Sequence, residues 1–189
     1  MSQISPVFPR QAAPALEVKT TDGGSWRLAD ATPENFTLVV MYRGLHCPIC
    51  SRYLKDLDNK LGDFAELGVD VIALSSDTED RARTAKQDWK LDNLTVGYGL
   101  SLESAREWGL YISEGIGKTS SGFEEPALFS EPGLFLVRPD GTIYFGSVQT
   151  MPFARPAFAE ILGATKFVLE RGYPARGEVV DHTSAQAAE

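Results

Sequence analysis

Metal-binding and disulfide-forming residues are scarce in this sequence, which has two cysteines and two histidines among 189 residues. A structural zinc site needs four ligands. His46 stands next to Cys47, where joint ligation would be awkward, and His182 lies in a polar C-terminal segment. Two cysteines are also too few for a disulfide framework. We therefore expect no metal centre.

Basic charge and long apolar runs are scarce as well. The 18 Lys and Arg residues stand against 26 Asp and Glu residues, a net charge of −8, which argues against nucleic acid or an anionic membrane as partner. No apolar run approaches the length needed to cross a membrane. Residues 1–10 lack the basic start and apolar core of a secretory signal. With so little cysteine, we expect a reducing compartment, the cytoplasm.

Both cysteines fall in one short motif, Cys47-Pro48-Ile49-Cys50. The preceding residues 36–42 form a β-branched apolar run that is typical of a strand buried on both faces. The following apolar residues recur at helical spacing; they are Ile49, Tyr53, Leu54, Leu57, Leu61 and Phe64. The motif therefore lies where a core strand ends and a helix begins.

The position of Cys47 predicts a reactive thiol. Pro48 suits the first residue of a helix, because its missing N–H would have no partner there. Cys47 is then the N-cap, where free backbone N–H groups and the helix dipole favour the thiolate. Cys50 follows one turn later and closer to the core, so we expect Cys47 to attack and Cys50 to resolve. Half a zinc site and a structural disulfide that closes almost no loop are the alternatives.

The rest of the chain predicts one α/β domain with a central mixed sheet and helices on both faces. Turn signals at 21–24 and 138–141 each separate two short apolar runs, as in β-hairpins. Residues 69–75 form a strand directly after the helix, so strand, helix and strand make a parallel crossover. The predicted units are an extended arm (1–14), a redox domain (14–172) and a flexible tail (173–189).

Two helices and a loop complete this prediction. Residues 48–68 are expected to form one long helix that is kinked at Gly62 and capped near Gly68. Residues 113–127, rich in Gly, Ser and Glu, predict a surface loop that borders the active site. A last helix from about residue 155 to 171 is expected to present one apolar side, made of Phe158, Ile161, Leu162, Thr165 and Leu169.

With C-x-x-C between a core strand and a helix, the chain resembles the thioredoxin-like superfold, a three-layer α/β/α arrangement, here with an N-terminal β-hairpin. Over about residues 14–172 it resembles the peroxiredoxin-like branch, the alkyl hydroperoxide reductase and thiol-specific antioxidant family. The segments that carry the resemblance are 41–50, 68–75 and 133–143. The resemblance places Cys47 on the peroxidatic cysteine. It places Pro132 where the superfold keeps a cis-proline that faces the sulfurs.

The motif departs from both families. Peroxiredoxins carry Thr or Ser three residues before the peroxidatic cysteine and Pro seven before it, and here these positions are Gly44 and Val40. Thioredoxins have Trp directly before the first cysteine and a buried Asp six before it, and here these are His46 and Met41. The C-P-x-C spacing is closer to glutaredoxins. The hydroxyl that would orient a peroxide is missing.

Three further side chains each have two interpretations. Arg43 either favours the thiolate or binds an oxyanion such as peroxide, or it is a solvated cation at the end of a strand. His46 donates a proton to a leaving thiolate, or it caps the loop. Arg155 matches a second arginine of peroxiredoxin sites, or it is solvated near the start of a helix, which the sequence favours.

Two enzymatic activities and one non-enzymatic role fit this motif. A thiol peroxidase would use Cys47 to reduce a hydroperoxide, Cys50 to form the disulfide, and an external thioredoxin-like or glutathione-like thiol to regenerate both. A thiol–disulfide oxidoreductase would use the same two sulfurs on a substrate disulfide. A redox sensor would bind a partner in one redox state. We expect an antioxidant, peroxiredoxin-like oxidoreductase without cofactor, and the sequence leaves a homodimer open.

Overall fold

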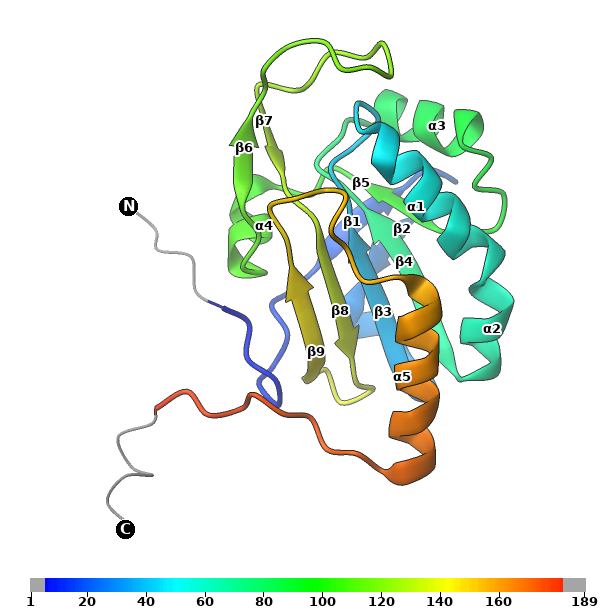
Figure 1. Cartoon of the computed structure of the whole chain (residues 1–189), viewed down its shortest axis with the longest axis vertical. Coiled ribbons are helices and arrows are strands. Elements are labelled where there is room, and N and C mark those ends of the chain that lie inside the picture. Colours follow the sequence, from blue (N-terminus) through cyan, green and yellow to red (C-terminus); the bar gives the residue numbers. More distant parts are fainter. Residues whose placement is uncertain (1–5, 182–189) are drawn as a thin grey trace.

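A seven-stranded mixed sheet forms the centre of the computed structural model, which describes residues 6–181 (Figure 1). The strand order is β2-β1-β5-β4-β3-β8-β9. The strands are β1 (Glu17–Thr20), β2 (Ser25–Arg27), β3 (Phe36–Met41), β4 (Val69–Leu74), β5 (Val96–Tyr98), β8 (Gly133–Val137) and β9 (Ile143–Val148). β3 runs parallel to β4 and antiparallel to β8, so the predicted mixed sheet is confirmed.

Helices cover both faces of this sheet, which gives the predicted three layers (Figure 1). They are α1 (Pro48–Asn59), α2 (Leu61–Glu66), α3 (Glu79–Asp88), α4 (Leu102–Glu107) and α5 (Phe158–Arg171), with a short 3-10 helix at Leu28–Asp30. Residues of α1, α2, α3 and α5 share one apolar cluster, and a residue of α4 belongs to a second cluster on the opposite face.

The central strand β3 shows why both faces are apolar. Leu38 and Val40 join the cluster beneath α1 and α5, whereas Val39 and Met41 join the cluster that contains Trp108. Every residue of β3 is buried. Each fully buried aliphatic side chain contributes about 1.5–3 kcal/mol relative to an exposed one. The strand therefore fixes the position of the active-site turn that follows it.

The predicted single helix over 48–68 is wrong. The chain forms α1 and α2 with a break at Lys60, and Gly62 lies within α2. α1 ends after the buried Asp58, whose carboxylate accepts hydrogen bonds from the backbone N–H groups of Asn93 and Leu94. The predicted cap at Gly68 is confirmed, because this residue has φ of +64° and donates its N–H to Ala65.

The predicted hairpins form at both turn signals. β1 pairs with β2 and β8 pairs with β9, and each turn contains a glycine with positive φ, Gly23 and Gly141. The N-terminal hairpin forms one edge of the sheet. The predicted last helix begins at Phe158, later than expected, and Leu169 is 36% exposed and does not belong to its buried side.

The segment predicted as a loop at 113–127 is partly a second sheet. β6 (Ile112–Glu114) pairs antiparallel with β7 (Leu128–Ser130), and an isolated bridge joins Lys118 to Glu124. Figure 1 shows this ribbon beyond one end of the main sheet, with its connecting segment reaching toward the start of α1. We call residues 115–127 the β6–β7 loop.

The predicted flexible tail is packed over its first residues. Ala175 is buried, and its carbonyl accepts a hydrogen bond of 3.0 Å from Arg10 Nε. Arg10 also forms an ion pair of 3.2 Å with Glu178. The remainder of the predicted tail, 182–189, and the first five residues of the predicted arm lie outside the described residues. Within residues 6–181, no helix is long and apolar enough to cross a bilayer.

Candidate active site

Cys47 and Cys50 lie at the start of α1, as the motif predicts. Cys47 is the N-cap in an extended conformation, and Pro48 is the first helical residue. The backbone N–H of Cys50 donates a hydrogen bond of 3.3 Å to Cys47 Sγ. Both thiols are free and buried, with exposed fractions of 1% for Cys47 and 0% for Cys50. The sulfur of Cys47 thus faces the backbone donor that the helix N-terminus provides.

The two thiols have opposite tendencies to ionise. The pKa of Cys47 is lowered to about 6, chiefly by a hydrogen bond from the Cys50 side chain, with help from the Cys50 N–H and from Arg155 and Arg43, and against the effect of burial. Burial raises the pKa of Cys50, and its hydrogen bond to Cys47 raises it further. At neutral pH, Cys47 is therefore the thiolate and Cys50 holds the shared proton.

Arg155 reaches the cysteine pair, so the solvated interpretation that the sequence favours is wrong. Its Nη2 lies 3.3 Å from Cys50 Sγ, and its guanidinium stacks 4.4 Å from the centre of the Tyr53 ring. Its Nε donates to the carbonyl of Pro152 at 2.5 Å. The residue stands in the connection before α5, where neither motif nor periodicity signals it.

Arg43 is paired with two carboxylates and is not a solvated cation. Its Nη2 lies 3.4 Å from Glu125 Oε1, and its Nε lies 3.4 Å from Glu131 Oε2. Its guanidinium also packs 4.7 Å from the centre of the Phe129 ring. Glu125 lies in the β6–β7 loop and Glu131 in the chain after β7. The sequence alone could not predict that these segments lie next to Arg43. Arg43 still helps to lower the pKa of Cys47.

His46 is fully buried and fixed from two sides. Arg81 Nη2 lies 3.4 Å from its Nδ1, and its ring packs 4.6 Å from the centre of Phe129. Burial lowers its pKa to about 4, so the ring is neutral at pH 7. Because arginine can only donate, Nδ1 accepts and the proton sits on Nε2, a buried atom without a hydrogen-bond partner. His46 therefore offers a neutral N–H donor rather than an imidazolium.

Gly44 replaces the expected hydroxyl for a backbone reason. Its φ is +130°, and a Cβ at this position would lie 2.7 Å from Asp77 Oδ2. Asp77 is itself buried; it accepts hydrogen bonds of 2.7 Å from the Leu45 N–H and from Arg81 Nε. A carboxylate thus closes the space beside Gly44. Asp77 follows β4 as Gly44 follows β3. Because these strands pair in parallel, their pairing could have predicted that Asp77 lies near Gly44.

The β6–β7 loop borders the active site, as predicted. Thr119 Oγ1 and Ser121 Oγ both donate to the carbonyl of His46, at 2.6 and 3.0 Å. Glu125 of the same loop contacts Arg43. The loop is therefore fastened to the residue directly before Cys47.

Pro132 is not a cis-proline. All peptide bonds within residues 6–181 are trans, so that part of the prediction is wrong. The Glu131 N–H donates to Tyr111 at 2.8 Å and the Pro132 carbonyl accepts from Gln149 at 3.1 Å. These bonds hold an extended connection between β7 and β8, which the intrinsic trans preference suits. A role for Pro132 beside the sulfurs stays a prediction.

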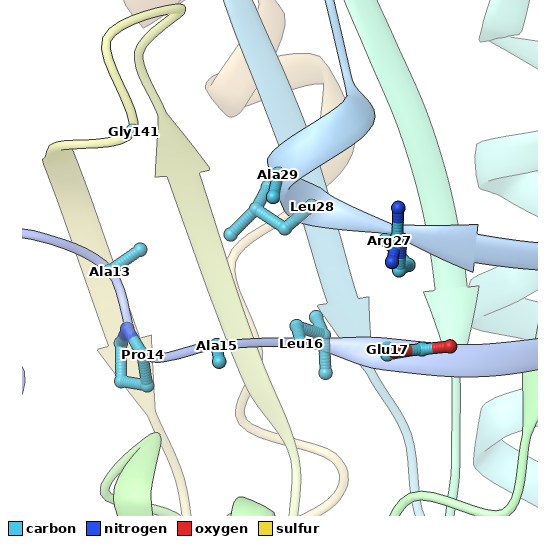
Figure 2. Close-up of a pocket in the computed structure, with 9 residues that line it drawn as sticks. All are labelled: Ala13, Pro14, Ala15, Leu16, Glu17, Arg27, Leu28, Ala29 and Gly141. Atoms are coloured by element: carbon cyan, nitrogen blue, oxygen red, sulfur yellow. The ribbon is translucent and has the colours of Figure 1, made fainter.

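The open hollow in Figure 2 is separate from the cysteines. It measures about 420 Å³ and lies between the chain before β1, the end of β2 and Gly141 of the β8–β9 turn. The residues that line it have mostly short apolar side chains (Figure 2). Among the residues that the structure describes, no three His, Cys, Asp or Glu side chains converge in a way that could hold a metal ion.

Comparisons with known proteins agree on one family. Residues 9–145 match the AhpC/TSA family. A protein named "Putative peroxiredoxin" from Mycobacterium tuberculosis is 28% identical over 127 residues, which are 65% of this chain and 77% of that protein.

Solved structures share the fold. The reduced 2-Cys peroxiredoxin of Plasmodium vivax superposes with a TM-score of 0.69 at 16% identity, covering 90% of this chain and 89% of that one. A peroxiredoxin-like protein from Aquifex aeolicus gives a TM-score of 0.68 at 18% identity, covering 87% and 90%. These matches confirm the predicted thioredoxin-like α/β fold.

Proposed function

The chain belongs to the AhpC/TSA family and is a thiol-based oxidoreductase, and we propose that it reduces hydroperoxides with Cys47 as nucleophile and Cys50 as resolving thiol. The observation that carries this assignment is the N-cap position of Cys47, with the Cys50 N–H at 3.3 Å from its sulfur. A sulfur held in this way is a thiolate near neutral pH, and the thiolate is the nucleophilic form.

The cycle balances with these two sulfurs and one external reductant. The Cys47 thiolate attacks the terminal oxygen of a hydroperoxide, the O–O bond breaks, and the products are Cys47 sulfenic acid and an alkoxide that takes up a proton. Cys50 then attacks Cys47 and displaces hydroxide, which leaves as water with the Cys50 proton. Two thiols supplied from outside reduce the resulting disulfide.

The surroundings of Cys47 also favour a second candidate, a thiol–disulfide oxidoreductase. Asp77 occupies the space beside Gly44, where the family's hydroxyl would orient a peroxide. A resolving thiol one helical turn away makes release of a mixed disulfide intramolecular. In this reaction Cys47 attacks a substrate disulfide and expels one thiolate, and Cys50 expels the second.

The partners that we propose follow from this cycle. A small dithiol protein or glutathione is the reductant, and a solved relative from Plasmodium yoelii is called thioredoxin peroxidase I. A second copy of the chain is the expected protein partner. β9 lies at the edge of the sheet, and the described N-terminal segment pairs only with residues 141–143, which are the end of the preceding turn and the first residue of β9. A free strand edge can pair with another chain. The cytoplasm stays our prediction for the compartment.

Rapid mixing of the reduced protein with hydrogen peroxide separates the two candidates. The reaction is followed by tryptophan fluorescence. One of the tryptophans, Trp89, has its ring centre 6.0 Å from that of Tyr42. Fast oxidation that is lost in Cys47→Ser and retained in Cys50→Ser supports the peroxidase. Oxidation no faster than that of a free thiol, together with ready reduction of a protein disulfide, supports the oxidoreductase instead.

A further inference from the structure

We infer that Arg155 is a catalytic residue of the second step, in which it stabilises the Cys50 sulfur as a thiolate while Cys50 attacks Cys47. The inference rests on the proposed roles of the two cysteines and adds a division of labour between them. The helix N-terminus prepares Cys47 for the first attack, and Arg155 prepares Cys50 for the second.

The guanidinium of Arg155 is held at Cys50 by three contacts. Its Nη2 lies 3.3 Å from Cys50 Sγ, its Nε donates to the Pro152 carbonyl, and its plane packs on the ring of Tyr53. Tyr53 is fixed in turn, because its hydroxyl donates to the Pro156 carbonyl at 2.8 Å. The connection from residue 152 to 156 thus clamps the cation against the resolving sulfur.

Arg155 differs from Arg43 in that its charge is not shared with carboxylates. Arg43 is paired with Glu125 and Glu131. Within residues 6–181, no carboxylate forms an ion pair with Arg155, and its Nη1 is buried without a hydrogen-bond partner. A partly buried guanidinium in this state favours an anion beside it.

Cys50 needs such help because its surroundings oppose ionisation. It is completely buried, and the groups that face it besides Arg155 are Cys47, the hydroxyls of Tyr42 and Tyr53, and the backbone N–H of Arg43, which favours the thiolate only weakly against burial and Cys47. Burial raises the pKa of both tyrosines, so they stay neutral at pH 7. Before the first attack, the proton on Cys50 stabilises the Cys47 thiolate. After the attack, Cys50 must lose that proton to become the nucleophile.

The step itself requires no further reagent. The Cys50 thiolate attacks Cys47 sulfenic acid, the S–O bond breaks as the S–S bond forms, and hydroxide leaves with the proton that Cys50 gave up. The Cys50 thiolate supplies the electron pair of the new S–S bond, and the pair of the broken S–O bond leaves on hydroxide. Arg155 contributes charge throughout and neither gains nor loses a proton, because guanidinium stays protonated.

The test separates the two steps in one experiment. Reduced wild type, Arg155→Met and Arg155→Lys are mixed with hydrogen peroxide. Samples quenched with dimedone at successive times are analysed by mass spectrometry for sulfenic acid and disulfide. Arg138→Met is the matched control, because Arg138 also packs on a tyrosine, at 5.1 Å from the Tyr144 ring, in the β8–β9 turn. The rate of sulfenic acid formation depends on the peroxide concentration, and the rate of disulfide formation does not.

We expect Arg155→Met to form sulfenic acid within about threefold of the wild-type rate and to accumulate it. Its disulfide formation at pH 7 should be roughly tenfold slower or more, with a pH midpoint raised by about one unit, since one pKa unit changes the thiolate fraction tenfold. Arg155→Lys keeps the charge and should retain much of the rate. Arg138→Met should match wild type in both steps.

Other outcomes overturn the inference or the function separately. Disulfide formation by Arg155→Met at the wild-type rate and midpoint would show that Arg155 does not serve Cys50. An equal loss in both steps would assign it to Cys47 as well and would also overturn the inference. Neither sulfenic acid nor disulfide in wild type would reject the peroxidase and leave Arg155 to be tested by the same pH midpoint on a mixed disulfide. Arg155→Lys provides that test if Arg155→Met does not fold.

Discussion

Cys47 and Cys50 are one helical turn apart, yet their environments differ in kind. Cys47 caps α1 and receives the Cys50 N–H, whereas Cys50 lies completely within the core beside Arg155. Helix geometry contributes to this difference, because the N-cap faces free N–H groups and a residue three positions later does not, and the burial of Cys50 adds to it. The division into attacking and resolving sulfur is therefore a property of position on the helix.

Gly44 provides the first prediction at the residue scale. Gly44→Ala should lower the free energy of unfolding by about 1–3 kcal/mol through backbone strain at positive φ. The overlap of the alanine Cβ with Asp77 should lower the free energy of unfolding further. Urea denaturation of the reduced proteins measures the effect.

Gly99→Ala is the matched control for Gly44→Ala. Gly99 has φ of +76°, and nothing lies within 4 Å of a Cβ built there. It should therefore show the backbone strain alone. Equal losses of stability in the two variants would mean that Asp77 does not close the space beside Gly44.

The sequence predicted residues that a local pattern announces and missed those that only the fold assembles. The N-cap role of Cys47 follows from Pro48 and the apolar stripe of α1, and it was confirmed. Asp77 reaches the site from another element and was missed, and Arg155 was named only through the family resemblance, with solvation favoured, because no spacing near the cysteines points to either. The hydroxyl that the family keeps was rightly noted as missing, but the backbone reason became visible only with the φ of Gly44.

At the scale of elements, we predict that the β6–β7 loop limits access to Cys47. Cys47 is 1% exposed, and the loop is fastened to the neighbouring His46 carbonyl by Thr119 and Ser121. A substrate can therefore reach the sulfur only when the chain around it opens locally. The two hydroxyls set part of the free energy of that opening.

The double variant Thr119→Val, Ser121→Ala tests this control. Two hydrogen bonds of about 1 kcal/mol each stabilise the closed loop, so alkylation of Cys47 by iodoacetamide should become roughly thirtyfold faster. Thr84→Val is the control, because Thr84 donates to the Asp80 carbonyl on the exposed side of α3. Equal alkylation rates in all three proteins would show that the loop does not limit access.

Strands and hairpins were predicted more accurately than helix ends. The strands have clear apolar runs with turn signals between them, and both hairpins formed where expected. The helix over 48–68 divided at Lys60 because Asp58 ties the end of α1 to the segment before β5, a contact between distant residues. The short strands β6 and β7 pair across the 13 residues 115–127, so no local turn signal announces them.

At the scale of the whole molecule, burying His46 links the active site to global stability. In the folded protein its pKa is about 4, and in the unfolded chain it returns to about 6.5. Between these values the unfolded chain binds a proton that the folded protein does not bind. Stability from this group is therefore complete above pH 6.5 and is lost as the pH falls toward 4.

We predict a loss of about 2 kcal/mol in the free energy of unfolding from His46 between pH 7 and pH 5. His46→Gln cannot titrate, so its loss over the same interval should be smaller by that amount. Urea denaturation of both reduced proteins at the two pH values gives the difference. The same pH dependence in both would mean that His46 is protonated in the folded state.

The layered fold explains how distant segments meet at two sulfurs. β3 and β4 run parallel, so their carboxyl ends bring Gly44 and Asp77 together, and the chain after β9 returns Arg155 to Cys50 at the start of α1. The mixed sheet could be predicted from the sequence because strand patterns and the crossover are local. The ion pairs of Arg43 with Glu125 and Glu131 could not, because they depend on where the β6–β7 ribbon lies.

Titration of the thiolate absorbance in the reduced protein tests the central claim most directly. We predict one thiolate with a midpoint near pH 6 in wild type, its absence in Cys47→Ser, and a low midpoint that remains in Cys50→Ser, whose hydroxyl and backbone N–H can both still donate to Cys47. A midpoint near the ordinary cysteine value in wild type would contradict the claim. A low-pH thiolate that persists in Cys47→Ser would contradict it as well, because Cys50 would then be the reactive sulfur.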